Sequence, residues 1–205
     1  MVSPPSALPF EPPDFAAPID IDAQLQACPA IATARGTFFQ YVSDLALKQT
    51  GTLPPGLFEG VSARRWTAWN TYPLTDFMRL AVNAARLAFP REPLREGLRR
   101  VGWTAYPSFA STMAGRVVVF AFGDDIDAML QAIPRAYSVS LRGAEARSRR
   151  VGPGHWEVEL RGVHNFADCY QVGVLEGAVR ARGGSPRIRI RRLPRPSDLD
   201  LEVRW

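Results

Sequence analysis

Residues 169–179 read CYQVGVLEGAV, an apolar segment in which Gly173 and Gly177 stand four residues apart. Four segments with the period-two alternation of strands flank it, two on each side: 138–149, 156–161, 186–193 and 199–205. Such alternation gives a strand one apolar and one polar face. The sequence therefore predicts the order β-β-α-β-β over residues 138–205, as a small antiparallel sheet with one long helix, in a protein of the α+β class.

Residues 31–137 are predicted to be mainly helical. Phe38, Val42 and Leu45 recur at helical spacing, and a second helix begins at Pro73, which suits a first-turn position. The stripe of that second helix comprises Leu74, Phe77, Met78, Ala81 and Ala85. Together with residues 138–205 this half forms a single domain over 31–205.

Three shorter patterns in the helical half lead to further expectations. The run 117–120 has strand propensity but also fits a helical stripe, and we interpret it as helix. Asp124 is expected to cap a helix over 125–132. The aromatic residues Trp66, Trp69 and Tyr72 are expected to close the edge of the core.

Residues 1–30 are predicted to form a proline-rich extended arm. Six prolines lie within residues 1–18, and proline fixes φ and lacks a backbone donor. A spaced proline arm can bind an aromatic groove, but we favour a tail that buries little surface.

Composition excludes several classes of protein. The 205 residues carry a net charge of +5, and 46% of them are hydrophobic. Lys48 is the only lysine, so a GC-rich coding bias explains the excess of arginine more simply than a phosphate-binding surface does. We therefore do not predict nucleic-acid binding. Two cysteines cannot make a disulfide framework. The longest apolar run is far shorter than the ~20 residues of a membrane helix, and no secretory signal is evident, so a cytoplasmic location is expected.

One cluster could support nucleophile or metal chemistry. His155, His164, Asp168 and Cys169 lie close together in the chain. However, five residues along a helix correspond to a rotation of about 140°, which does not align His164 with Cys169. Cys169 shares an apolar face with Val172 and is interpreted as structural. We therefore predict no catalytic residue and no metal ligand.

Glu176 and the glycine pair of the same helix need partners. A carboxylate at the edge of an apolar face requires water, a cation or a ligand, and an ion pair with an arginine is the favoured interpretation for Glu176. Gly173 and Gly177 leave a flat strip for close approach of a neighbour, either within the chain or in a homodimer. Asn165 is expected to cap the helix, followed by Asp168 in its first turn.

Arg187, Arg189 and Arg191 alternate with Ile188 and Ile190 and form a basic row on one strand face. Such a row can bind an acidic protein partner or phosphate. The alternative is a solvated face or a charged edge strand.

The order of several motifs resembles a known family. These motifs are RGTFF at 35–39, YPLTDFMRL at 72–80, CY at 169–170 with GVLEG at 173–177, and the ending VRW at 203–205. This set is similar to a myxobacteria-restricted protein family of unknown function, number 2378 in the DUF series. The resemblance covers roughly residues 30–205 and implies no assigned activity.

More distantly, the Gly-x-Leu-Glu-Gly helix within a small sheet resembles the haem-nitric-oxide-binding and vinyl-reductase-like sensory domains. That resemblance implies a ligand cavity between a helical half and a sheet half. It makes Cys169, Tyr170, Gly173 and Glu176 candidate ligand contacts. The chain departs from both groups where their chemistry lies. Haem sensors carry Tyr-x-Ser-x-Arg, whereas residues 137–142 have a different spacing, and the zinc-bearing sensors use several cysteines. We therefore expect no cofactor.

Two functions from different classes follow, and an enzyme that uses Cys169 or Glu176 is the least favoured alternative. The first is a non-enzymatic sensory or signalling module that binds a small apolar or amphipathic ligand between its halves. The second is a protein–protein adaptor or dimerisation module that works through the arginine row or the glycine strip. An internal cavity favours the first, and a filled core with an exposed apolar patch favours the second.

Overall fold

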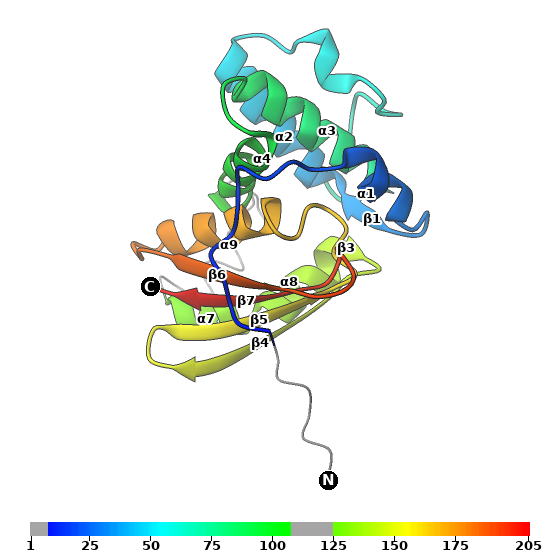
Figure 1. The fold of residues 1–205 in the computed structure, drawn as a ribbon. Helices are drawn as coiled ribbons and strands as arrows, with labels where there is room; N and C mark the ends of the chain where they lie inside the picture. The colour runs from blue at the N-terminus through cyan, green and yellow to red at the C-terminus, as the bar shows by residue number, and fades with distance from the viewer. Residues whose placement is uncertain (1–7, 108–124) are drawn as a thin grey trace.

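The structure is a computed structural model, and it describes residues 8–107 and 125–205. Its larger sheet is antiparallel with the strand order β4-β5-β7-β6. The strands are β4 (Glu145–Gly152), β5 (His155–Arg161), β6 (Arg187–Arg192) and β7 (Leu199–Arg204). Helix α9 (Tyr170–Arg180) connects β5 to β6 and lies between this sheet and the helical half (Figure 1). The predicted α+β class and the order β-β-α-β-β are confirmed.

The helical half contains the two predicted helices and a small second sheet. Its elements are α2 (Gly36–Thr50), η1 (Pro55–Phe58), α3 (Leu74–Ala88), α4 (Leu94–Trp103), and the sheet β2 (Thr71–Pro73), β1 (Thr33–Arg35) and β3 (Leu141–Arg142). The five-residue stripe predicted for α3 is fully buried. Helix α2 ends at Gly51, whose φ of 77° is a left-handed value that glycine adopts without strain.

The sheet part begins later than predicted. Residues 138–140 belong to helix α8 (Ile133–Ser140), because Pro134 lies in its first turn, where proline favours a helix, and Ile133 and Tyr137 are buried on one of its faces. Helix α7 (Ile126–Gln131) is capped by Asp125, which accepts a hydrogen bond from the Asp127 amide. The predicted cap Asp124 and the run 117–120 lie outside the described residues.

The N-terminal arm is packed against the domain and is partly helical, contrary to the expectation of an extended tail. Residues 21–27 form helix α1 (Ile21–Ala27), since Asp20 caps it by accepting from the Ala23 amide. Glu11 pairs with Ile190 on the edge of the sheet through two backbone hydrogen bonds. The Phe15 ring lies 4.5 Å from the Arg99 guanidinium. The described part of the arm thus covers the β6 edge and part of α4.

Two of the three predicted core-edge aromatics take that role. Trp66 stacks on buried Phe39 at 5.1 Å, and Tyr72 meets the same ring edge-on. Trp69 is 65% exposed. It lies in the turn before β2 and points away from the core, so the expectation was wrong for this residue.

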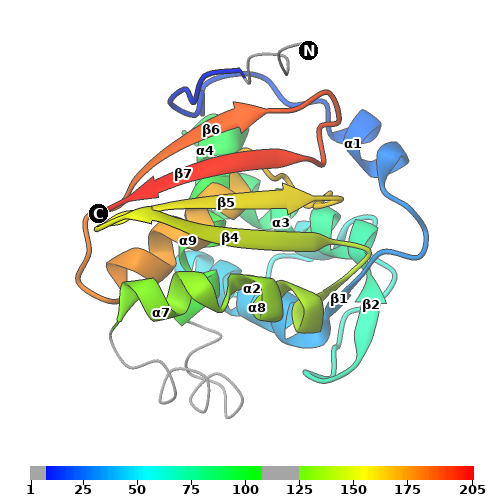
Figure 2. The ribbon, with the colours of Figure 1, turned by 90° about the horizontal axis from the view of Figure 1, so that it is seen from below.

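One face of the large sheet packs on α9 (Figure 2), and the residues on the other face are mainly charged. The apolar side chains of β7, Leu199, Leu201 and Val203, are buried toward the helices. The intervening Asp200 and Glu202 are covered by arginines from neighbouring strands. None of the helices in residues 8–107 and 125–205 is long and apolar enough to cross a membrane.

Candidate functional site

A cavity of about 150 Å³ lies where the helical half meets α8 and α9. Its walls are mainly apolar and come from both halves of the domain. Phe38 of α2 and Phe77 of α3 face it from one half, and Ile133 of α8 and Leu175 of α9 face it from the other. An apolar cavity of roughly this volume accepts one benzene-sized ligand or a xenon atom.

The cavity follows one face of α9. Gln171, Val174, Ala178 and Arg182 all line it, and their spacing of three to four residues places them in a row along the helix. The row continues past the C-terminal end of the helix to Arg182. The cavity therefore has two ends, one near the N-terminus of α9 and one at its C-terminus.

Hydroxyl groups in the wall are paired near the N-terminal end. Tyr137 donates to Gln171 Oε1 at 2.6 Å, and the hydroxyl of Tyr170 bonds that of Tyr41. Burial raises the pKa of Tyr41, Tyr137 and Tyr170 above the ordinary tyrosine value, and neighbouring tyrosines add to this effect for Tyr41 and Tyr137. These phenols stay neutral and can only exchange hydrogen bonds.

Three other polar atoms of the wall have no hydrogen-bond partner in the part of the chain that the structure describes. They are Tyr106 Oη, Asn165 Oδ1 and Arg182 Nε, and each is buried. Asn165 as a whole is 2% exposed. Because a buried polar atom without a partner costs about 1–3 kcal/mol, their gathering around one cavity indicates a place for a polar ligand atom or water.

The opposite face of α9 is packed directly on α4. A Cβ atom added to Gly173 would collide with the carbonyl of Arg99, and one added to Gly177 would collide with that of Trp103. A Cβ atom added to Gly102 of α4 would likewise collide with the carbonyl of Tyr170. The glycine strip is thus occupied by a helix of the same chain. Of the two alternatives for this strip, the structure supports the contact within the chain.

Glu176 forms an ion pair across the same interface. Arg99 donates to its two carboxylate oxygens at 2.7 and 2.9 Å, and Trp103 Nε1 donates at 2.6 Å. Glu96 binds the remaining side of the Arg99 guanidinium. The carboxylate is therefore fully paired, as the favoured interpretation predicted.

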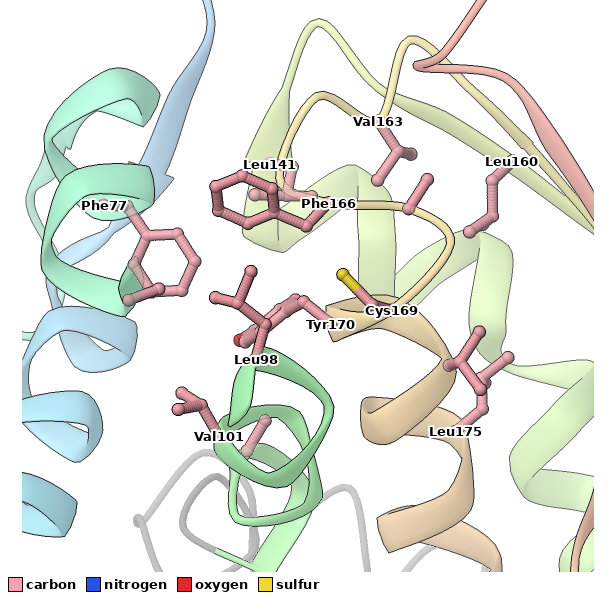
Figure 3. Packing of buried hydrophobic residues seen from close by; sticks show 14 of the residues in the cluster. Phe77, Leu98, Val101, Leu141, Leu160, Val163, Phe166, Cys169, Tyr170 and Leu175 are labelled. Carbon is pink, nitrogen blue, oxygen red and sulfur yellow. The ribbon is translucent and has the colours of Figure 1, made fainter. Parts of the chain in front are cut away.

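Cys169 precedes the first turn of α9 within the apolar core (Figure 3). It is completely buried among side chains that include Phe166, Leu160 and Leu175. Burial raises the pKa of its thiol, and the neighbouring Asp168 raises it further. A thiol that does not ionise is a poor nucleophile, which agrees with a structural role.

Of the four residues predicted to contact a ligand, Tyr170 lines the cavity. Gly173 and Glu176 lie on the α4 side, and Cys169 lies in the core below. Their role as ligand contacts stays a prediction that this geometry does not favour.

Asn165 lies in the cavity wall and does not cap α9. The residue preceding α9 is Cys169, and no side chain caps the helix. The turn that leads into it contains Phe166 with a φ of 57°, which carries Asn165 away from the first turn.

The wall also contains Tyr106, Tyr137, Gln171 and Arg182, none of which was predicted as a site residue. The sequence contains one signal for them. Gln171 and Arg182 share the helical face of Val174 and Ala178, so polar residues recur along an otherwise apolar stripe.

The arginine row on β6 is partly neutralised across strands. Arg191 binds Asp200 at 2.8 Å, Arg189 lies 3.8 Å from Glu202, and Arg187 is exposed. The Arg191 guanidinium also covers the ring of Phe10 from the arm. The role of this row in binding a partner stays a prediction, and the pairing favours the alternative of a charged sheet face.

The two histidines lie apart from the cavity. His155 is 3.2 Å from Glu202 on the sheet, and His164 lines a small depression with Gln24. Burial lowers the pKa of His164, an effect that Asp198 opposes. Within residues 8–107 and 125–205, no group of three or more His, Cys, Asp or Glu residues could hold a metal ion.

Comparison with solved structures identifies a known fold. An H-NOX protein from S. oneidensis, in the Fe(II) state, matches with a TM-score of 0.67 and 13% identity over 83% of this chain and 95% of that one. An unliganded Fe(II) H-NOX mutant from K. algicida matches with a TM-score of 0.62 and 11% identity, again over 83% and 95%. At these identities the similarity establishes a common fold only.

The Fe(II) state of these H-NOX proteins implies haem, and haem does not fit this cavity well. A haem iron needs an axial ligand such as His, Cys or Met. Neither histidine and neither cysteine of the chain lines the cavity, and the remaining side chains of a ligating type in its described wall are Met129 and the three tyrosines Tyr106, Tyr137 and Tyr170. The volume of about 150 Å³ is also below the ~300–1,000 Å³ typical of cofactor sites. Among the described residues, the cavity wall thus contains neither a histidine nor a cysteine to hold a haem iron.

A comparison with curated proteins gave no match. The sequence model of one family, described as "Protein of unknown function (DUF2378)", matches residues 32–205. This range contains the motifs at 35–39, 72–80 and 169–177, and it includes every element from β1 to β7. The chain belongs to this family.

Proposed function

We propose that the protein is a non-enzymatic sensory or signalling module that binds a small apolar or amphipathic molecule in the cavity beside α9. The observation that carries the proposal is a chamber of about 150 Å³ with apolar walls and three unpartnered polar atoms, in the part of the chain that the structure describes. A cavity in a core lowers the free energy of unfolding. A ligand that fills the cavity would recover part of this loss.

The position of the cavity suits a sensor. Its walls come from α2 and α3 on one side and from α7, α8 and α9 on the other. A ligand that contacts both halves favours the arrangement in which both contacts form, and it can shift the population toward that arrangement. Similarity to H-NOX domains supports a fold able to enclose a ligand at this junction.

The test uses a neutral probe and one pair of variants. We expect 1-hexanol to bind the protein in isothermal titration calorimetry, with one site per chain. Ala178→Leu fills the cavity and should weaken binding at least tenfold. Ala181→Leu makes the same change at an exposed position after α9 and should leave binding unchanged.

Two outcomes would contradict the proposal. One is the absence of any binding to the native protein, and the other is equal binding by both variants. Native mass spectrometry of protein purified from its own host adds an independent test, because a resident ligand would appear as a fixed mass increase.

A further inference from the structure

Two of the unpartnered polar atoms lie at the same end of the cavity. The Arg182 guanidinium stacks over the Tyr106 ring with its carbon 4.6 Å from the ring centre. Arg182 Nε and Tyr106 Oη are both buried, and neither has a hydrogen-bond partner in residues 8–107 and 125–205. Both residues line the cavity. This end therefore presents two unused hydrogen-bond donors, one of which carries a positive charge.

The residues that line the rest of the cavity restrict the ligand further. Between Gln171 and Arg182 the wall formed by α9 is apolar, at Val174, Leu175 and Ala178. At a rise of 1.5 Å per residue the helical part of this row, from Gln171 to Ala178, spans about 10 Å. A ligand that fills it needs an apolar body with its polar group at one end.

The polar group that fits the Arg182 end is an anion with two acceptor atoms. A carboxylate has two oxygens, and each can accept from one of the two donors, with the arginine bond strengthened by charge. Burying a carboxylate requires such pairing. A neutral hydroxyl can also accept hydrogen bonds from these donors, but it leaves the charge of Arg182 without compensation.

We infer that the cavity takes an apolar monocarboxylate, with its carboxylate held by Arg182 Nε and the Tyr106 hydroxyl and its apolar part along α9. This inference rests on the proposed function, since it specifies the ligand class of the same site. It adds the requirement that the ligand carries a carboxylate, which the shape of the cavity alone does not set.

The experiment compares hexanoate with 1-hexanol, which have the same chain length but differ in their polar group. Calorimetric titration of the native protein at pH 7 should give at least tenfold tighter binding for hexanoate. Arg182→Gln should reduce hexanoate binding to the level of 1-hexanol and leave 1-hexanol unchanged. Tyr106→Phe removes the second donor and should weaken hexanoate by a smaller factor.

Arg180→Gln is the matched control. Arg180 is also an arginine at the end of α9, but it is exposed and lies over the Trp103 ring, outside the cavity wall. Hexanoate binding should be unchanged in this variant. A loss equal to that of Arg182→Gln would attribute the effect to general surface charge and overturn the inference.

The outcomes separate this inference from the proposed function. If 1-hexanol binds and hexanoate binds equally or more weakly, the carboxylate class is wrong while ligand binding stands. If neither probe binds, the proposed function itself fails. If hexanoate binds tightly but Arg182→Gln has no effect, the assigned carboxylate site is wrong.

Discussion

The two faces of α9 are built in opposite ways. Toward α4, Gly173 and Gly177 bring backbone against backbone, and Glu176 has all its partners. Toward α8, the same helix borders a cavity, and polar atoms of the wall have no partner among the described residues. One face fixes the helix in place, and the other leaves room. A binding site on a rigid element keeps its geometry, so the close-packed face supports the hollow one.

The largest expected effect tests the close-packed face. Gly173→Ala would place a methyl group against the carbonyl of Arg99, and a backbone atom cannot move aside without shifting α4. Alanine gains about 1 kcal/mol of helix propensity over glycine, but overpacking of this kind costs more. We expect the free energy of unfolding to fall by about 2–4 kcal/mol in urea titrations.

Gly56→Ala is the control for this prediction, because a Cβ atom there meets no atom within 4 Å. Its effect should stay below about 0.5 kcal/mol. Equal stability of the two variants would mean that α4 and α9 are not in close contact in solution.

The second prediction concerns the ion pair on the same face. Glu176→Gln keeps the shape but removes the charge, and its amide group would point donors at Arg99 or Trp103. Charged hydrogen bonds contribute about 1.5–3 kcal/mol, so we expect a loss of about 2 kcal/mol, measured by urea denaturation. Glu159→Gln changes a 47% exposed carboxylate that lies 3.4 Å from Arg161 and should cost less than about 1 kcal/mol. A loss of stability in Glu159→Gln larger than that in Glu176→Gln would show that the buried ion pair contributes no more than an exposed one.

The sequence predicted the close-packed face better than the hollow one. Small residues four apart and a lone carboxylate on an apolar helix already indicate close approach and an ion pair. The cavity depends on which side chains fail to meet across α2, α3, α8 and α9. That property belongs to the assembled core and leaves no periodic pattern in the chain.

Two local predictions from the sequence were wrong because tertiary contacts decided the structure. Residues 138–140 alternate as a strand does, yet burial of Tyr137 and the start of α8 at Ile133 keep them helical. The arm was predicted to be free because prolines oppose regular structure. They do not prevent pairing by Glu11 or contact by Phe15, and tertiary contacts of this type are not encoded in composition.

The third prediction tests the docking of the arm on the close-packed face. The rings of Phe15 and Trp103 both lie against the Arg99 guanidinium, with their centres 4.5 and 4.7 Å from its carbon. Removing one such ring costs about 1 kcal/mol through the cation–π contact and lost apolar burial. Phe15→Ala should therefore lower the free energy of unfolding by about 1 kcal/mol in urea titrations. The control is Leu8→Ala, at a position 63% exposed, which should have no measurable effect. If Phe15→Ala also leaves stability unchanged, the arm is not docked on the domain in solution.

The smallest expected effect comes from the hollow face and completes the comparison. Ala178→Leu adds three carbon atoms, where Gly173→Ala adds one, yet it extends into the cavity and not against a backbone. Each buried methylene contributes about 0.8 kcal/mol, which offsets the rotamer adjustments needed to place the side chain. We expect a change in the free energy of unfolding of less than about 1 kcal/mol in either direction by urea titration. A loss above about 2 kcal/mol would mean that the wall closes onto Ala178 in solution and that both faces of α9 are packed alike. If Ala178→Leu changes the free energy of unfolding less than the smaller substitution Gly173→Ala does, α9 has one packed side and one hollow side.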